Sequence, residues 1–252
     1  MYHICPVPLL ERVIPPECKH HMCIANVVNS DMDYAAFYSI RRRRGEWITL
    51  DVGAFEDMDT TVEELWLATD KIKPAEIVLP DKFKDAEETC VRSAQAYEAL
   101  DDAALMTAQF MIVPQGRDYG EYITCLKVLA SNVGPRVHTV GIIEETTELY
   151  DRSRERMAED VRSRFPELDV HLLGFMSDFS DVAIRGARSC DTGKLVTWGI
   201  NGMLVMREGP WPDTYPGRET MGGRQGFFQY DCIDPFMVET ARENVLEWSR
   251  EI

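Results

Sequence analysis

Short apolar runs alternate with longer amphipathic stretches along the chain. The apolar runs are rich in β-branched residues and lack an alternating polar pattern, which is typical of strands covered on both faces. These runs predict strands at residues 21–28, 47–50, 76–79, 110–113, 137–143, 170–173 and 187–190. An eighth strand could come from residues 226–230 or from the N-terminal residues.

The amphipathic stretches between these runs have the spacing of helices that bury one face. They predict helices at residues 33–44, 61–72, 85–105, 119–131, 148–165 and 178–185, and a final helix at 235–250. The segment Thr60-Thr61-Val62-Glu63-Glu64, with Glu three residues after Thr, predicts a capping box. Repeated strand–helix units imply a parallel sheet with right-handed crossovers. We therefore expect the α/β class and a (β/α)8 TIM-like barrel, because no G-x-G-x-x-G turn follows a strand to favour a dinucleotide-binding fold.

No linker divides the 252 residues, and a barrel of this kind commonly fills a domain of that size. We expect one domain over residues 1–252. Residues 209–226 contain three prolines and five glycines, which predicts a long loop before the final helix. Loops of this length are uncommon unless they act as lids or binding loops.

Charge and cysteine content narrow the possible partners and the compartment. The chain has 27 Lys and Arg against 43 Asp and Glu, a net charge of −16. Broad non-specific binding to nucleic acid is excluded, because it needs an extended basic surface, but a local basic groove is compatible with this charge. No apolar run is long enough to cross a membrane, and no basic segment precedes an apolar run at the start, so we expect neither a membrane partner nor a signal peptide. Seven cysteines without a secretory signal indicate reduced thiols and a cytoplasmic location.

Polar residues recur where the expected strands end. In a barrel the chemistry sits in the loops after the carboxyl ends of the strands. The residues at these positions are Asp51, Asp81, Gln115, Gly116, Arg117, Glu144, Glu145, Gly174 and Asp191. Asp51 and Asp191 stand beside small residues, and two carboxylates from different strands suit glycosyl transfer. The alternative for a single strand-end Asp is that it caps the next helix.

Five short motifs follow one another between residues 21 and 205. They are Leu50-Asp51-Val52-Gly53-Ala54-Phe55-Glu56, Val113-Pro114-Gln115-Gly116, Gly141-Ile142-Ile143-Glu144-Glu145, Leu172-Leu173-Gly174-Phe175 and Ser189-Cys190-Asp191-Thr192. In this order they resemble motifs of the tRNA-guanine transglycosylase superfamily. The first is similar to its Asp-Ser-Gly-Gly-Phe/Tyr-Gln element, the second to Val-Gln-Gly, the third to a Gly-rich strand end carrying a Glu, the fourth to Leu-Met-Gly-Val-Gly and the last to the nucleophile strand. The resemblance is greatest to the shorter members that insert 7-deazaguanines into DNA.

The resemblance implies a role for each matching residue. Asp191 would be the nucleophile and Asp51 the general base. The base would be bound by Phe55, Asp81, Gln115, Gly116, Glu144 and Gly174, with Phe55 or Phe175 stacking on it. The alternative for both aromatic residues is ordinary core packing.

The implied reaction exchanges guanine in DNA for a 7-deazaguanine base similar to preQ0, through a covalent Asp-glycosyl intermediate and without a cofactor. The partners would be DNA and the free base, with tRNA as the alternative polymer, and a homodimer could widen the groove. A non-catalytic purine-binding barrel would need neither Asp51 nor Asp191, and a nucleoside hydrolase would need the carboxylates but no basic groove.

Two features depart from the family's pattern. Val52 stands where the family has Ser. The family's zinc cluster, C-x-C-x-x-C with a distant His, has no counterpart, because Cys232 is the only cysteine after Asp191. We therefore expect neither a zinc subdomain nor a bound metal. The segment Cys18-Lys19-His20-His21-Met22-Cys23 is rich in soft donors, but it lacks the spacing of two zinc knuckles and suits buried free cysteines as well.

Basic residues offer sites for the nucleic-acid backbone. Arg41, Arg42, Arg43 and Arg44 end the first expected helix, where they can complement the helix dipole or clamp phosphates together with Lys82, Lys84 and Arg117. A second set, Arg152, Arg154, Arg156, Arg162 and Arg164, is interleaved with acids, which is typical of a solvated helix face.

Overall fold

The computed structural model describes residues 2–3, 10–53, 60–101, 107–174, 186–205 and 234–249. Several expected features lie outside these residues: the aromatic residues Phe55 and Phe175, the helix at 178–185, the loop at 209–226 and the candidate strand at 226–230. None of the described helices is both long and apolar enough to span a bilayer.

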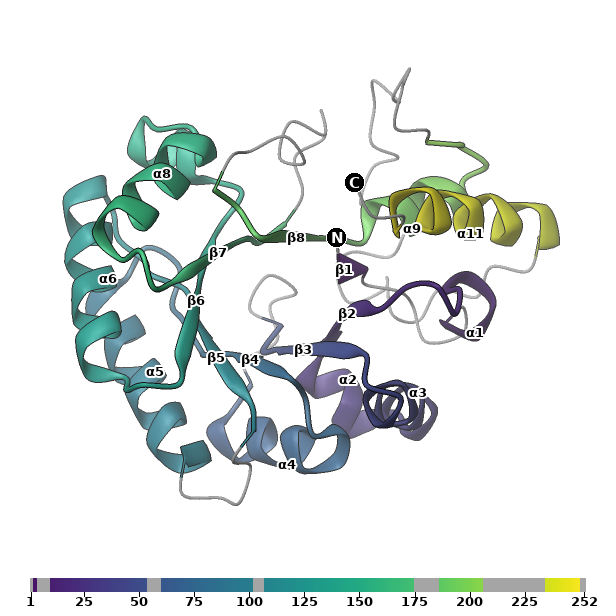
Figure 1. Cartoon of the computed structure of the whole chain (residues 1–252), viewed down its shortest axis with the longest axis horizontal. Coiled ribbons are helices and arrows are strands. Elements are labelled where there is room, and N and C mark those ends of the chain that lie inside the picture. Colours follow the sequence, from purple (N-terminus) through teal and green to yellow (C-terminus); the bar gives the residue numbers. More distant parts are fainter. Residues whose placement is uncertain are drawn as a thin grey trace.

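The strands form a parallel, barrel-shaped sheet (Figure 1). They are β1 (Tyr2–His3), β2 (His20–Ile24), β3 (Trp47–Asp51), β4 (Glu76–Val78), β5 (Gln109–Ile112), β6 (Val137–Ile142), β7 (Asp169–Leu172) and β8 (Ser189–Thr192). Each strand pairs in parallel with the next, and the two-residue β1 also pairs with β8 and closes the ring. The expected α/β class with a parallel, barrel-shaped sheet is confirmed, and the N-terminal residues supply the strand between β8 and β2.

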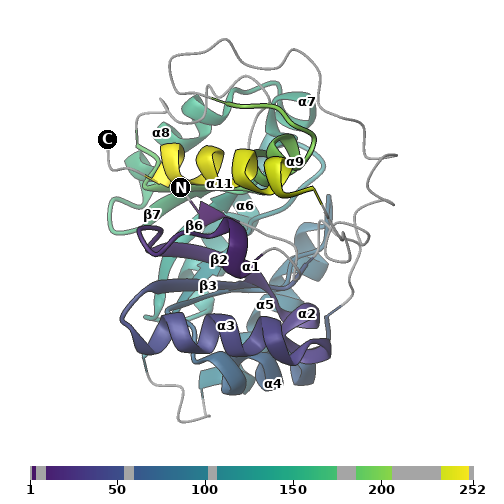
Figure 2. The ribbon, with the colours of Figure 1, turned by 90° about the vertical axis from the view of Figure 1, so that its right-hand side faces the viewer.

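Helices lie outside the sheet and connect its strands (Figure 1). They are α1 (Leu10–Val13), α2 (Ala25–Ser30), α3 (Met32–Arg43), α4 (Val62–Ile72), α5 (Ala86–Asp101), α6 (Tyr119–Asn132), α7 (Thr146–Tyr150), α8 (Arg154–Arg164), α9 (Lys194–Ile200) and α11 (Pro235–Ser249). In Figure 2, α2, α3 and α4 cover one side of the barrel, and α11 packs against α9 near the N-terminus. The capping box is present at Thr61 and Glu64, which confirms the expected start of α4.

Two expected elements differ in the structure. The strand expected at 21–28 ends at Ile24, and residues 25–30 form α2 instead. A short, mostly apolar run such as Ala25-Asn26-Val27-Val28 is compatible with a buried strand and with a buried helix, so the packing of α2 on α4 decides its conformation. The helix expected at 148–165 is interrupted at Asp151, whose left-handed backbone (φ 51°) ends α7, and Ser153 caps the start of α8.

Side chains pointing inward from the strands fill the barrel. Toward the carboxyl ends of the strands, Val78, Met111 and Val113 form a small apolar cluster with Ile143 and Leu173. At the amino end of the strands the buried Glu76 carboxylate accepts hydrogen bonds from Thr49, Thr139 and Arg188. Sequence reasoning did not single out this network. Because packed side chains fill the interior of the barrel, we expect its chemistry at the mouth, which the carboxyl ends of the strands form.

Candidate active site

Asp191 is buried near the carboxyl end of β8, with 5% of its surface exposed. Its Oδ1 atom accepts a hydrogen bond from the backbone N–H of Gly174 at 3.0 Å and another from Nε2 of His171 at 3.1 Å. Among the described residues, none donates a hydrogen bond to Oδ2. Two donors on one oxygen hold the carboxylate in a single orientation and leave its second oxygen available for chemistry.

His171 orients Asp191 from the neighbouring strand β7. Its side chain is fully buried, and its Nδ1 atom lies 2.7 Å from the hydroxyl oxygen of Ser189. An ionised carboxylate can only accept, so Nε2 carries the proton and Nδ1 accepts from the Ser189 hydroxyl. Ser189 is two residues deeper along β8 than Asp191, so the carboxylate and not the hydroxyl lies toward the mouth.

In the sequence His171 stands inside an apolar run that predicts a strand, and that pattern indicates no role for it. Strand parity is the signal that could have found it. His171 and Leu173 share one face of β7, Ser189 and Asp191 share one face of β8, and the two strands pair with His171 opposite Ser189.

Gly174 aims its N–H at Asp191 through an unusual backbone conformation. Its φ of 68° lies in the left-handed region that favours glycine. A Cβ atom at this position would lie 3.5 Å from the Oε2 atom of Glu144, which places the Glu144 side chain beside Gly174. The structure thus brings together three predicted residues, Asp191, Gly174 and Glu144, at the ends of β8, β7 and β6.

The buried Arg154 side chain holds the ends of β6 and β7 in place. From the first residue of α8 its guanidinium donates to the carbonyl oxygens of Leu173 and Gly174, both at 2.6 Å, and to that of Ile142. Only 3% of Arg154 is exposed. The expectation that this arginine belongs to a solvated helix face is therefore wrong, because the strand-end carbonyls need a donor that only a buried cation at this position provides.

Asp81 and Gln115 form a second pair, at the ends of β4 and β5. The Gln115 amide nitrogen donates to Oδ2 of Asp81 at 2.7 Å, and its amide oxygen accepts from the backbone N–H of Lys84 at 3.4 Å. Gln115 is buried. Burial raises the pKa of Asp81 to about 6, although the hydrogen bond from Gln115 favours the ionised form. A fixed amide beside a carboxyl that titrates near neutral pH can read donors and acceptors on a planar base.

Gly116 has a structural requirement of its own. A Cβ atom there would lie 2.5 Å from the backbone nitrogen of Tyr122, so α6 can pack this close only against glycine. The Gly116 carbonyl accepts a hydrogen bond from the Tyr150 hydroxyl at 3.2 Å. Packing alone accounts for the glycine, so its role in binding a base stays a prediction.

Asp51 is the last residue of β3, so it lies at the carboxyl end of its strand like the other site residues. It is half-buried, and its Oδ1 atom accepts the backbone N–H of Val52 at 2.9 Å. This hydrogen bond between neighbouring residues helps the backbone to turn at the end of β3.

The basic residues divide between the two ends of the barrel. Lys82, Lys84 and Arg117 are exposed on loops after β4 and β5, at the same end as Asp81, and Arg117 is paired with Glu121 at 2.6 Å. The cluster at the end of α3 immediately precedes β3, so it lies at the amino end of the strands, away from the mouth. Arg42, Arg43 and Arg44 therefore cannot clamp a nucleic acid bound at Asp191. This corrects the expectation from the sequence.

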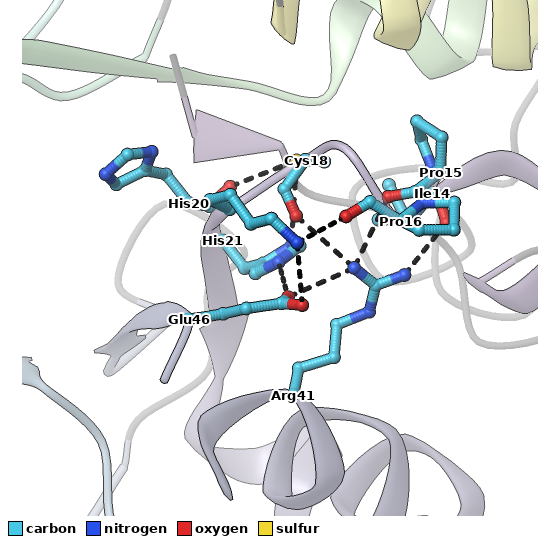
Figure 3. Close-up of polar contacts among 9 residues, drawn as sticks. Ile14, Pro15, Pro16, Cys18, His20, His21, Arg41 and Glu46 are labelled. Atoms are coloured by element: carbon cyan, nitrogen blue, oxygen red, sulfur yellow. Dashed lines mark hydrogen bonds and ion pairs between the residues drawn. The ribbon is translucent and has the colours of Figure 1, made fainter. Parts of the chain in front are cut away.

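Arg41 differs from its three neighbours because it is buried (Figure 3). Its guanidinium donates to the carbonyl oxygens of Ile14, Pro15 and Cys18 and to the Glu46 carboxylate. Because its guanidinium already donates to these four protein acceptors, Arg41 is not available to a phosphate. The predicted clamp role is wrong for this residue as well.

The cysteine–histidine segment contributes to the same buried network (Figure 3). His21 Nε2 lies 2.8 Å from Glu46 Oε2, and His21 Nδ1 lies 3.9 Å from the Cys18 sulfur. Burial alone would raise the pKa of the Cys18 thiol, but the contact with His21 brings that pKa below its usual value. For His21 the effects are reversed: burial alone would lower its pKa, but the contacts with Cys18 and Glu46 raise it above the usual value. Cys23 is separate, since its sulfur contacts the Thr49 carbonyl and burial raises its pKa well above the usual value.

In the part of the chain that the structure describes, no group of three or more His, Cys, Asp or Glu side chains is placed to hold a metal ion. Comparison with models of known families and with curated proteins finds no match to this chain. The chemistry of the mouth is therefore defined by its own groups: an oriented carboxylate with one open oxygen, a second strand-end carboxylate, and an amide–carboxyl pair.

Proposed function

We propose that this chain is a base-exchanging glycosyltransferase, built as a single (β/α)8 barrel without a zinc subdomain. It replaces guanine in DNA with a 7-deazaguanine base through a glycosyl ester on Asp191. The observation that carries the proposal is the geometry of Asp191: a carboxylate buried at the mouth, with Oδ1 taken by two donors and Oδ2 accepting from no described residue. A carboxylate nucleophile needs that arrangement, because attack on a sugar carbon requires one oriented oxygen.

In the first half-reaction Oδ2 of Asp191 attacks C1′ of the target nucleotide. The C1′–N9 bond breaks, its electron pair leaves with guanine, and a proton from Asp51 goes to N9. Positive charge develops on the sugar as that bond lengthens, and the nearby carboxylates stabilise it. The product is free guanine and an ester between C1′ and Asp191.

The second half-reaction is the reverse with another base. The incoming 7-deazaguanine loses its N9 proton to Asp51, N9 attacks C1′, and the ester bond to Asp191 breaks to regenerate the carboxylate. Atoms and charge balance over the cycle without an added oxidant, reductant or nucleoside triphosphate. His171 and the Gly174 N–H stabilise the departing carboxylate through their bonds to Oδ1.

Base recognition falls to the pair Asp81 and Gln115. The purine edge shared by guanine and 7-deazaguanines presents N–H donors beside a carbonyl acceptor, and an ionised Asp81 can accept from those donors. Gln115 holds Asp81 in position from the end of β5, and Glu144 and Gly174 lie beside each other at the ends of β6 and β7, where Gly174 donates to Asp191.

DNA is the polymer we assign, because the ordered motifs are most similar to those of the shorter, DNA-modifying relatives. A base in a duplex must be turned out of its stack to reach a buried carboxylate. Lys82 and Lys84, exposed at the same end as Asp81, supply cations for the nearby backbone.

The test is incorporation of radiolabelled guanine into matched DNA and tRNA substrates at one salt concentration. We expect label in DNA, and with unlabelled DNA a protein–DNA adduct that survives denaturant. Asp191→Asn should abolish both and keep the circular dichroism spectrum of the wild type, whereas the surface change Asp70→Asn, a matched loss of one carboxylate, should keep both. Near wild-type exchange by Asp191→Asn would overturn the mechanism.

The same assay separates the competing assignments. Faster labelling of tRNA overturns DNA as the polymer and leaves the chemistry standing. Release of guanine without incorporation indicates a nucleoside hydrolase. Binding of a purine base with neither adduct nor release indicates a non-catalytic base-binding barrel.

A further inference from the structure

A hollow opens on the rim of the barrel, among the helices that follow β5 and β6. It has a volume of about 390 Å³ and is lined by Tyr119, Tyr150, Asp151, Arg152 and Arg156. We call it the rim groove. Its walls come from the start of α6, the end of α7 and the start of α8, which follow the carboxyl ends of β5 and β6. The rim groove therefore lies at the same end of the barrel as Asp81, Gln115 and Asp191.

One hydrogen bond connects the rim groove to the base site. The Tyr150 hydroxyl, from the groove wall, donates to the carbonyl of Gly116 at 3.2 Å. Gly116 directly follows Gln115, whose amide holds Asp81. Through Tyr150 and Gly116 the groove wall therefore adjoins the residue that holds Asp81.

The wall is rigid where Arg152 lies. Its guanidinium sits 3.9 Å from the centre of the Tyr119 ring, and its Nη1 atom lies 3.0 Å from Oδ2 of Asp160. The Tyr119 hydroxyl donates to the same carboxylate oxygen. These contacts fix an aromatic ring and a planar cation in one position, and they balance the charge of Arg152 with that of Asp160.

Arg156 is the cation that remains available. It is exposed on α8, and among the described residues its guanidinium has no acidic or hydrogen-bonding partner. Among the described residues that line the groove, Asp151 is the one carboxylate. In a chain with a net charge of −16, attraction for an anion must be local. Because the charge of Arg152 is balanced by Asp160, the phosphate contact falls to Arg156, whose planar guanidinium can donate two parallel hydrogen bonds to phosphate oxygens.

We propose that the rim groove binds the phosphodiester next to the extruded nucleotide of the DNA strand, with Arg156 contacting the phosphate. Tyr119 and Arg152 form the fixed wall against which the neighbouring sugar lies. This assignment rests on the proposed function for the identity of the polymer. It also replaces the basic cluster at the end of α3, which lies at the other end of the barrel.

The test measures binding without turnover. A fluorescein-labelled single-stranded oligonucleotide containing guanine is titrated with the full chain carrying Asp191→Asn, alone or with Arg156→Gln, and fluorescence anisotropy is followed at several salt concentrations. Loss of one phosphate contact should raise Kd by about 3- to 10-fold and reduce the salt-dependence slope by about 1. The matched control is Arg43→Gln, the same charge change at an exposed position on α3, which should leave Kd and slope unchanged.

Each outcome decides the proposal. If Arg156→Gln and Arg43→Gln raise Kd equally, the proposal is overturned, because the effect would then come from net charge. It is also overturned if Arg156→Gln leaves Kd unchanged, or if the parent protein with Asp191→Asn does not bind the oligonucleotide. In the active chain Arg156→Gln should raise KM for DNA and leave KM for the free base unchanged. If no exchange is detected but Arg156 still controls binding, the transglycosylase chemistry fails and the rim groove stands.

Discussion

The Nε2 atom of His171 lies 3.1 Å from Oδ1 of Asp191, and both side chains are buried on adjacent strands at the mouth of the barrel. With the Gly174 N–H on the same oxygen, the imidazole determines which carboxylate oxygen remains open. His171 is thus a positioning residue for the proposed nucleophile.

Replacing this donor should slow exchange without weakening base binding. His171→Leu leaves a buried charge short of one hydrogen bond. If the loss of about 1–3 kcal/mol falls on the transition state, kcat should drop by about 5- to 150-fold. KM for the free base should not change, because Asp81 and Gln115 are intact. His171→Gln keeps an N–H donor and should recover part of kcat; equal losses in both variants would show that the histidine acts only through packing.

Asp81 should make the folded state less stable as pH rises. Its pKa of about 6 is above the ordinary value of 3.8, so between these pH values the folded protein binds a proton that the unfolded chain has lost, and stability falls. Asp81→Asn lacks this cost. Urea unfolding should show the variant gaining up to about 3 kcal/mol over wild type on going from pH 4 to pH 8. A difference between the two proteins that does not change with pH would contradict the raised pKa.

The same titration should appear in catalysis. As pH falls through about 6, Asp81 becomes protonated and can no longer accept from two donors of the base. We expect kcat/KM for the free base to fall on this limb, and Asp81→Asn to have a lower but flatter profile. Initial rates of labelled-base incorporation between pH 5 and pH 8 measure both, and a wild-type rate that rises toward acid pH would rule out the ionised form as the binding form.

Glu46 should stabilise the fold at neutral pH through its buried contacts. Burial alone would raise its pKa, but hydrogen bonds from His21 and Arg41 lower it to about 2, below the ordinary value of 4.5. The stability from this group is therefore present above pH 4.5 and is lost as pH falls toward 2. Glu46→Gln should cost about 3 kcal/mol at pH 7 and progressively less below pH 4.5, measured by denaturant unfolding. Glu87→Gln, an exposed position on α5, should stay within about 0.5 kcal/mol of wild type at every pH.

Arg154 should be necessary for both stability and activity. Arg154→Lys keeps the charge but cannot reach the carbonyls of Ile142, Leu173 and Gly174 together, because an ammonium is a single point and a guanidinium is a fork. Thermal unfolding should show a loss of about 2–4 kcal/mol, and the remaining folded protein should have a lower kcat because Gly174 no longer aims its N–H firmly at Asp191. Arg164→Lys, exposed in the last turn of the same helix, is the matched control and should change neither.

Sequence pattern located most of the secondary structure because its signals are local. Strand runs, helix periodicity and the Thr61–Glu64 capping box depend on residues a few positions apart, and the structure has strands and helices close to those positions. Strand-end carboxylates such as Asp191 were also visible, since parallel strands bring their carboxyl ends to one side of the sheet. The predicted strand is wrong for residues 25–28, because a short, mostly apolar run is compatible with either conformation.

Tertiary structure alone decided which charged side chains are buried and at which end of the barrel they lie. Arg41 and Arg154 look like their exposed neighbours in sequence, but carbonyls and carboxylates from distant elements surround them. His171 gained a role only when β7 paired with β8 and set it against Asp191. The chain itself determines the order and type of its elements, because those follow from local backbone preferences and burial of one face. The partners of a buried polar group come from segments far away along the chain, so they are established only when the barrel closes.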